Sequence, residues 1–384
     1  MIIITKKHKN IFISKGYGYF NKELKEMIIK NNLECEKELE EEINGGDEIL
    51  GLKENKADKK SSNKDNDEKN SNNLIEKSNG NIDNSNSSDI EDNKNNEESK
   101  SKIKSNNKKP ICFIDTMNNN KEDYLDYAGG LDEDNFKNGF GILHLTDGSF
   151  FKGIFSHGHA NGFGIFSHSK GDTYKGEFNN DEICGYGEYH FQQMSVTSGI
   201  WSKSELDGVG VEKWQNSAYF GEFSHGKKEG VGRYEWKNKA RYDGEWKEDN
   251  MNGYGIYYFS DGRKYLGEWK NNYMEGFGIY LWKNKKKYFG FFKKGVKHGF
   301  GIFYFLNDKF LIGFWKNGKQ NGFVKHINGN NIKYGIYKDG KKEKLFEKEE
   351  EFWNNFVDIK SQKYKKFFEM DKTEIYNYIN SINE

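Results

Sequence analysis

The chain has 384 residues, of which 43 are glycine and one is proline, and its 60 basic and 60 acidic residues give a formal net charge of zero. This balance does not by itself predict binding to nucleic acid or to a membrane. Aromatic residues make up 16% of the chain, although all hydrophobic residues reach only 34%. Such a composition disfavours an ordinary α/β enzyme, in which aliphatic residues fill parallel strands and helices.

Cysteine usage and the absence of apolar runs predict a cytoplasmic protein. Cys35, Cys112 and Cys184 are odd in number and show no CxxC spacing, which argues against a disulfide framework. No apolar run reaches the roughly 18 residues needed to cross a bilayer. The polar start, residues 1–7, is too short for a signal peptide. We therefore expect a protein that is not secreted and has no transmembrane segment.

Residues 1–50 predict a segment with strands and one helix. Gly16-Tyr17-Gly18 predicts strands within residues 1–20. Residues 21–44 predict a helix, because Asn21 can cap it and Gly45-Gly46 can end it.

Residues 51–110 form a low-complexity segment. Between Lys53 and Lys109 there are 15 Asn, 13 Lys and 10 Ser, and no aromatic residue. Such a stretch cannot bury enough apolar surface to offset its chain entropy, so disorder is predicted. A docking or phosphorylation tail and a low-complexity insert without a role both remain open.

A fixed frame of aromatic residues and glycines repeats from residue 127 to residue 340. Residues 242–246 (YDGEW) precede a GYG at 253–255, and the frame returns 23 residues later as YLGEW with GFG. Ten units begin at intervals of 22 to 24 residues, which indicates one supersecondary unit per repeat in a stacked array. Their first residues are Tyr127, Phe151, Tyr174, Thr197, Tyr219, Tyr242, Tyr265, Tyr288, Leu311 and Lys333.

This frame, YxGxW followed by GxG within 23 residues, resembles the MORN (membrane occupation and recognition nexus) repeat. The resemblance covers about residues 127–340. Four units depart from the frame. The first has one extra residue, the unit at Thr197 lacks its first aromatic, and Val324 replaces the second Gly of the ninth unit. The last unit keeps only Gly335, Tyr337 and Gly340.

The repeat frame itself predicts the fold. Side chains alternate between the faces of a strand, so Tyr242, Gly244 and Trp246 are expected on one face. Position 8 is Gly, Asn or Asp in eight of nine units, and these residues tolerate positive φ, so a turn is predicted there. A second turn is predicted near position 20. Two strands and two turns per unit predict an all-β repeat array, an elongated antiparallel β-meander of 23-residue hairpins. Helices and a disordered N-terminal insert flank it.

Residues 341–384 predict a helical cap for the open end of the array. A helix is expected from Lys344 to Asp371, with Phe352, Phe356 and Ile359 against the last units. Asp371 with Glu374 predicts a capping box that opens a short final helix through Ile379.

Three kinds of chemical site are discounted. Residues 221–227 match most of a phosphate-binding loop, but the Ser or Thr that should follow Lys is missing. Cys184 and His190 lie along a predicted hairpin without an orienting acid, so Cys184 is expected to be a small packed residue. Three histidines lack metal-ligand partners at short spacing and are expected to be solvated: His157, His159 and His168. We expect no catalytic residue, cofactor or metal.

Charge is distributed unevenly along the array. Residues from Tyr127 to Gly262 carry a net −7, whereas those from Arg263 to Gly340 carry +12. Acidic lipid headgroups, the acidic tails of a filament protein and the acidic half of a second copy all fit the basic half. A solvated face is the alternative, and nucleic acid is not expected because every repeat needs its rings for packing. The candidate surface for an anionic partner comprises Lys283, Lys285, Lys286, Lys287, Lys293, Lys294 and Lys297.

A homodimer is a further expectation, for which two contacts compete. The opposite charges of the halves predict an antiparallel overlap that about 150 mM salt weakens. The resemblance implies pairing near the C-terminal repeats instead, with Trp315 and Tyr337 as candidate contacts. The second contact is favoured, because exposed ion pairs contribute only about 0–1 kcal/mol each.

The resemblance implies a non-catalytic scaffold that organises proteins at a membrane-associated cytoskeletal structure, at the cell cortex or peripheral on a membrane. Two alternatives stay open: a module that binds anionic phospholipids such as phosphoinositides, and a docking subunit that regulates a catalytic partner. MORN arrays also occur fused to lipid kinase or SET-type methyltransferase domains, but these flanks are too short to hold such a domain. An enzyme is therefore not expected.

Overall fold

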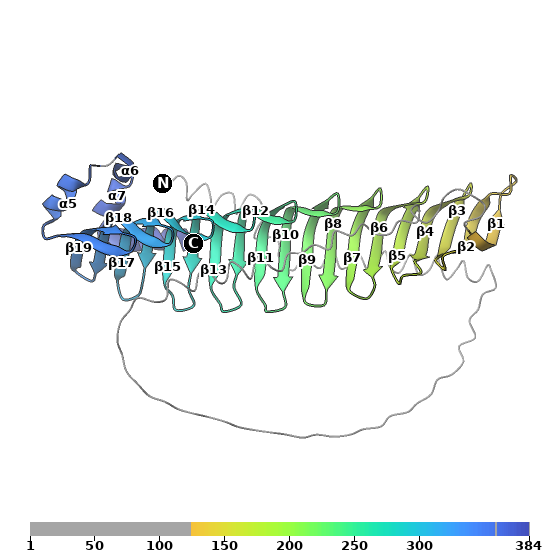
Figure 1. The fold of residues 1–384 in the computed structure, drawn as a ribbon, viewed down its shortest axis with the longest axis horizontal. Coiled ribbons are helices and arrows are strands. Elements are labelled where there is room, and N and C mark those ends of the chain that lie inside the picture. The colour runs from red at the N-terminus through yellow and green to blue at the C-terminus, as the bar shows by residue number, and fades with distance from the viewer. Residues whose placement is uncertain (1–123, 358, 384) are drawn as a thin grey trace, which may run out of the picture.

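The computed structural model describes residues 124–357 and 359–383. Over these residues the chain forms one 20-stranded sheet and four short helices. Figure 1 shows the strands following one another in chain order along an elongated rod, with helices at the end that carries β17–β19. The segments predicted over residues 1–50 and 51–110 lie outside the described residues.

Every strand is antiparallel to the next one in the chain. This is the predicted open β-meander, and no helix interrupts it between Tyr124 and Phe346. The strands are β1 (Tyr124–Leu131), β2 (Lys137–Leu145), β3 (Phe150–Ser156), β4 (His159–Ser167), β5 (Thr173–Asn179), β6 (Glu182–Phe191), β7 (Ser195–Ser202), β8 (Glu205–Trp214), β9 (Ser217–Ser224), β10 (Lys227–Trp236), β11 (Arg241–Lys247), β12 (Asn250–Tyr258), β13 (Lys264–Lys270), β14 (Tyr273–Leu281), β15 (Lys287–Lys293), β16 (Val296–Tyr304), β17 (Lys309–Lys316), β18 (Lys319–Asn328), β19 (Asn331–Lys338) and β20 (Lys341–Phe346).

One face of the sheet, here called the inner face, holds the long aromatic core of the array. The ring of Tyr242 lies over two glycines, and a Cβ on Gly244 or Gly255 would come within 2.4 Å of it. Neighbouring repeats are tied together because Tyr242 packs edge-to-face against Trp246 at 5.3 Å and against Trp269 of the next unit at 5.4 Å. The repeat therefore needs glycine at positions 3 and 14 because the ring at position 1 occupies that space.

Two units that depart from the frame illustrate the same rule. Leu311 takes the ring position in the ninth unit, and there Val324 stands in place of the second glycine. In the unit that begins with Thr197, the side chain of Leu206 lies over Gly199 and Gly210 instead of a ring. In the ninth unit, where no ring lies above it, the second glycine position therefore accepts a side chain, whereas in the Thr197 unit Leu206 fills the space and both glycines are kept.

The turn at position 8 is left-handed in all nine units, with φ from 59° at Ser204 to 89° at Gly158. Asp249 at this position also links two repeats. Its Oδ1 accepts a hydrogen bond from the backbone N–H of Lys228 at 3.0 Å, and its own N–H donates to the Lys228 carbonyl at 3.1 Å. Asn272 makes the equivalent pair of bonds with Met251.

The prediction of one helix from Lys344 to Asp371 is wrong. Residues 341–346 form β20, which pairs with β19, and the rest divides into α5 (Glu349–Asn355), α6 (Ile359–Gln362) and α7 (Lys365–Glu369). The breaks let rings reach different parts of the sheet: Phe352 and Phe356 contact Phe323, whereas Phe367 contacts Phe300. The side chain of Ile359 is outside the described part of the chain.

The predicted capping box is confirmed. The Glu374 N–H donates to Asp371 Oδ1 at 2.8 Å, and the Asp371 N–H donates to Glu374 Oε2 at 2.9 Å. The helix that it opens, α8 (Lys372–Asn383), runs past the predicted end at Ile379.

Candidate interaction surfaces

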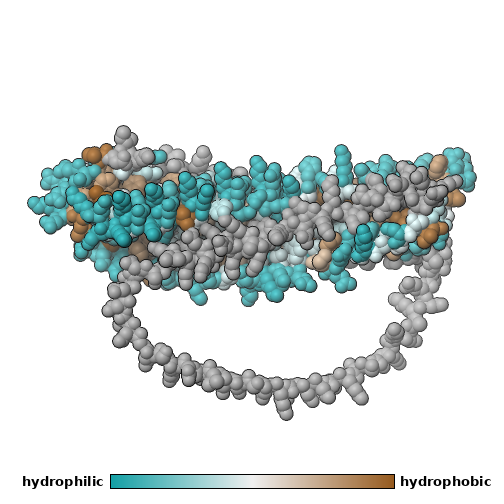
Figure 2. All heavy atoms as spheres, in the orientation of Figure 1, coloured by the Kyte–Doolittle hydropathy of each residue, from teal (hydrophilic) through white to brown (hydrophobic). Residues whose placement is uncertain are grey.

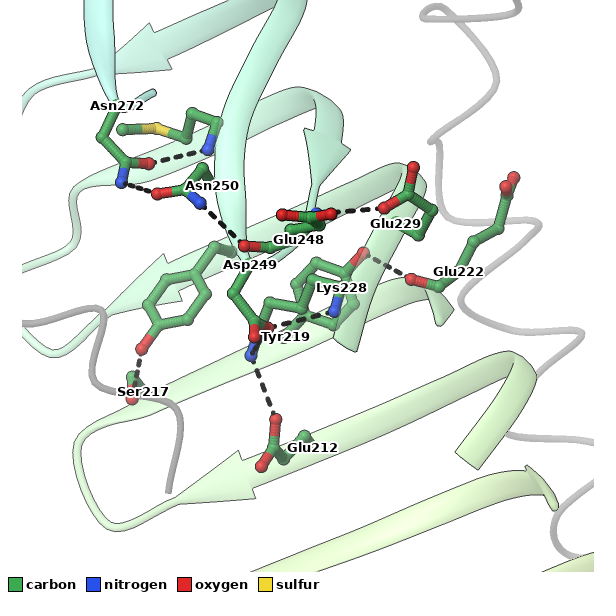
Figure 3. A network of polar contacts seen from close by, with 12 residues as sticks. Glu212, Ser217, Tyr219, Glu222, Lys228, Glu229, Glu248, Asp249, Asn250 and Asn272 are labelled. Carbon is green, nitrogen blue, oxygen red and sulfur yellow. Dashed lines mark hydrogen bonds and ion pairs between the residues drawn. The ribbon is translucent and has the colours of Figure 1, made fainter. Parts of the chain in front are cut away.

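A buried polar network interrupts the aromatic inner face between β8 and β12 (Figure 3). The Nζ atom of Lys228, only 1% exposed, lies 3.2 Å from Glu212 Oε2 and 3.5 Å from Asp249 Oδ1. The same ammonium group lies over the rings of Trp214 and Tyr219, at 5.2 and 5.3 Å from their centroids. Its charge is thus neutralised by neighbours from three successive repeats.

Two coordinated replacements create this network. Lys228 occupies position 10, which carries Met251 and Met274 in the following units. Glu212 occupies position 16, where the next unit has Tyr234. Burial raises the pKa of Glu212, and the adjacent Lys228 opposes that rise. The groups satisfy one another, so the network is a structural feature of the rod rather than a ligand site.

The structure separates the seven lysines predicted to form one anionic-partner surface. Lys283, Lys285 and Lys286 lie in the β14–β15 turn, whereas Lys293 and Lys294 lie at the opposite end of β15, where the chain turns into β16. These two turns stand on opposite long edges of the rod. The predicted cluster is therefore two groups, with Lys287 at the start of β15 in the first of them.

Lys297 does not belong to an exposed surface, which corrects the prediction. It is 7% exposed, and its ammonium group lies over the rings of Trp282, Tyr288 and Phe303 at 5.7, 5.8 and 5.2 Å. Like Lys228 it occupies position 10, so its side chain points into the inner face. The sequence run KKGVK conceals this, because strand alternation and the turn decide which lysine is buried.

A different set of lysines forms a regular row, called here the lysine edge. Position 6 is the last strand residue before the turn of each hairpin, and from β11 onward every such residue is lysine. All five side chains are exposed, and none pairs with a carboxylate in the described part of the chain. The lysine edge comprises Lys247, Lys270, Lys293, Lys316 and Lys338.

The lysine edge begins at β11, so four of its five lysines lie in the basic half of the rod and Lys247 lies just before it. The four preceding units carry uncharged residues at position 6: Ser156, Asn179, Ser202 and Ser224. Three more exposed lysines stand beside the row: Lys294 in a turn, and Lys319 and Lys341 at the starts of β18 and β20. Sequence reasoning selected only Lys293 from the row, because it looked for lysines adjacent in sequence. Their common phase within the 23-residue repeat was the signal that could have found the others.

The two residues of the predicted dimer contact also differ in exposure. Trp315 is 5% exposed, with its ring 5.2 Å from that of Tyr288 in the inner face, so it cannot form a surface contact as predicted. Tyr337 is half-buried beside His326, at 5.6 Å between ring centroids, and burial raises its pKa. Tyr337 alone stays a candidate contact.

The discounted histidines and cysteine have ordinary surroundings, with one correction. His168 is buried at 6% exposure rather than solvated, and its Nδ1 accepts a hydrogen bond from the Lys170 N–H. His159 pairs with Asp181 at 2.6 Å, and His190 pairs with Glu188. Within the described ranges, no group of three His, Cys, Asp or Glu side chains is placed to hold a metal ion. None of the described helices has the length and hydropathy needed to span a membrane.

The helices cover the opposite face of the sheet, the outer face, over β15–β19. Phe300 stacks on Tyr364 at 4.3 Å in a core with Phe289, Ile302 and Ile312. Lys325, buried within this core, donates from Nζ to the carbonyls of Phe368 (2.7 Å) and Met370 (3.0 Å), at the carboxyl end of α7. Figure 2 shows hydrophilic residues over much of the visible face and hydrophobic residues at both ends of the rod, including the end with β17–β19 and the helices.

An open array of β-hairpins with a common inner face is the architecture of a repeat scaffold. A model of the MORN repeat matches nine segments of the chain: residues 133–150, 151–173, 174–193, 198–218, 219–241, 242–262, 265–287, 288–307 and 312–323. The chain is thus a MORN-repeat protein over this part of its length, as the frame of tyrosines and glycines predicted. Repeats of this family are non-catalytic scaffold or binding modules.

Other comparisons add little. No curated protein matches the sequence. Among solved structures, the TCP10 domain of Danio rerio CPAP is 9% identical with a TM-score of 0.31, over 54% of this chain and 99% of that one. The TCP domain of Drosophila melanogaster SAS-4 is 12% identical with a TM-score of 0.22, over 50% and 90%. Scores this low do not establish a shared arrangement.

Proposed function

We propose that this chain is a non-catalytic scaffold that organises protein partners at a membrane-associated cytoskeletal structure. The main support for this proposal is an extended sheet that presents five exposed lysines at one regular position along one edge. Such a surface can hold an anionic partner in a fixed orientation along the rod. The cytoskeletal location is supported by the MORN family, whose members commonly act at cortical or budding structures in single-celled eukaryotes.

The build of the rod suits this role. Between β2 and β19 each strand is hydrogen-bonded on both sides, and inner-face ring pairs join successive repeats, as Tyr242 does with Trp269. The unit at Thr197 lacks a ring at position 1, and there Trp214 packs against Tyr234 of the next unit. Sites far apart on the rod therefore keep a fixed separation. A scaffold needs this property because it must hold different partners at defined distances.

A second candidate is a module that binds anionic phospholipids directly, and the same exposed lysines favour it. Each lysine near an anionic membrane surface contributes roughly 1 kcal/mol to the free energy of membrane binding. Lipid binding would need only a basic surface, whereas protein binding would also depend on the spacing of its lysines.

Two measurements on the full chain separate these functions. Affinity purification of the tagged chain from its own cells, followed by sedimentation and mass spectrometry, should recover at least two proteins in one complex with it. Vesicles of phosphatidylcholine with 20% phosphatidylserine should leave the purified chain in the supernatant at physiological salt. A chain that is recovered without protein partners and that sediments with vesicles would contradict the scaffold and support the lipid module.

A further inference from the structure

The lysine edge has a fixed pitch because the register of the sheet does not drift. Glycines face glycines across successive strands, as in Gly244 with Gly255, Gly255 with Gly267 and Gly267 with Gly278. The five lysines lie on every second strand, from β11 to β19, and neighbouring strands stand about 4.8 Å apart. Their backbone positions therefore recur about every 9.6 Å and span about 38 Å.

This pitch distinguishes among extended anionic partners. A polyproline II helix has three residues per turn and rises about 3.1 Å per residue, so every third side chain returns to one face after about 9.3 Å. An α-helix returns to one face after seven residues, about 10.5 Å, and rotates by about 20° each time. Same-face residues of a β-strand recur at about 6.7 or 13 Å. Only the polyproline II repeat stays in phase with five lysines.

Acidic residues limit the row at its two ends. Glu248 follows Lys247 directly, Asp339 follows Lys338, and both carboxylates are exposed. The three turns between them carry Asn271, Lys294 and Asn317 at the same position. Between the ends, one carboxylate lies beside the row, that of Glu275, whose Oε2 accepts a hydrogen bond from the Lys294 N–H at 2.9 Å. With five lysines and this single carboxylate, the row keeps a positive charge that suits a segment with about five carboxylates.

We infer that the lysine edge binds a protein segment in the polyproline II conformation that carries Asp or Glu at every third residue. Each carboxylate then faces one lysine of the row, and the intervening residues point away from the rod. The inference rests on the proposed scaffold function and names the chemistry of one partner.

The test uses the purified full chain and fluorescent 15-residue peptides in a binding titration by anisotropy at 50 mM salt. One peptide contains five Pro-Pro-Glu triplets, and the other has the same composition with its glutamates at irregular intervals. Each exposed pair is expected to change binding by about two- to fivefold, so the periodic peptide should bind at least tenfold more tightly. Raising the salt to 300 mM should weaken its binding severalfold, since exposed charges are screened.

Matched variants locate the site. The triple variant K270Q/K293Q/K316Q should lose at least about eightfold in affinity for the periodic peptide. The variant K239Q/K283Q/K285Q removes the same charge from the opposite edge and should change affinity less than twofold. Equal binding of the two peptides, or equal losses in the two variants, would overturn the inference. If purified complexes still contain the same partners in the lysine-edge variant, the scaffold function stands and this inference alone fails.

Discussion

The two halves of the rod share one inner face and differ on the outer face. On the outer face in the C-terminal half, Phe289 and Ile279 face each other across strands and belong to the core beneath the helices. In the middle of the rod the equivalent positions hold Asp243 and Arg233, which form an ion pair at 2.6 Å. The inner face therefore defines the repeat, whereas the outer face is free to diverge toward a covering segment or toward solvent.

The largest expected effect comes from removing the cover. A chain that ends at Phe346 keeps β20 but exposes the apolar outer face of β15–β19, and patches of this kind drive association. We expect oligomers or aggregates in light scattering coupled to size exclusion. In the truncated chain, the added pair F300K/I312K should restore a monomer. A truncated chain that stays monomeric without them would show that the helices are not needed as a cover.

A break in the inner-face charge network should have the next largest effect. Lys228→Met leaves Glu212 buried without its cation and should lower the local free energy of opening by about 3 kcal/mol. The double variant E212Y/K228M recreates the pattern of the neighbouring units and should be as stable as the wild type or more so. Hydrogen exchange of β8–β12 measures both. If the double variant lost as much local stability as K228M, the packing at this site would require the ion pair itself.

The same network predicts a pH dependence. The pKa of Glu212 is raised above its ordinary value of 4.5 by burial, so its native form holds a proton more tightly than the unfolded form. Its stabilising contribution is present below pH 4.5 and is lost as the pH rises through the raised pKa. Relative to Glu212→Gln, the wild type should therefore lose stability from pH 4 to pH 7. Parallel stability curves for the two proteins would contradict this assignment.

A side chain at the second glycine position should lower the stability of the repeat by overpacking. Gly255→Ala places a Cβ against the Tyr242 ring, and overpacking of this kind costs about 1–3 kcal/mol. The companion variant Y242L/G255A copies the arrangement of Leu311 and Val324 and should recover part of the loss. The readout is hydrogen exchange of β11 and β12, and no recovery would mean that the ring is not what excludes the side chain.

The most local effect should be confined to the covered end. Lys325→Met removes two hydrogen bonds to the carboxyl end of α7, each worth about 1.5–3 kcal/mol when one group is charged, while the added apolar contact offsets part of the loss. Exchange in α5–α8 should accelerate, and exchange in β3–β12 should not change. A uniform change along the rod would refute the separation between the two faces.

The sequence predicted the meander and its turns because each depends on local, repeated requirements. Tyr242 needs two glycines beside it, and the turn at Asp249 needs a residue that tolerates positive φ. The prediction of a continuous helix from Lys344 was wrong because contacts with the outer face of the sheet decide where that chain bends, and no local sequence pattern describes those contacts. The lysine surface was only partly predicted, since strand direction places Lys283 and Lys293 on opposite edges and turns Lys297 inward.

We propose that this rod organises proteins through exposed surfaces such as the lysine edge, while the inner face only holds the rod together. The most direct test compares the partners that co-purify with the wild type, with K270Q/K293Q/K316Q and with K239Q/K283Q/K285Q, each expressed at equal level and quantified by mass spectrometry. We expect the first variant to lose at least one partner while it retains others, and the second variant to keep the wild-type set. Identical sets for all three proteins would contradict a partner-binding role for the lysine edge, and the absence of any protein partner would contradict the scaffold itself.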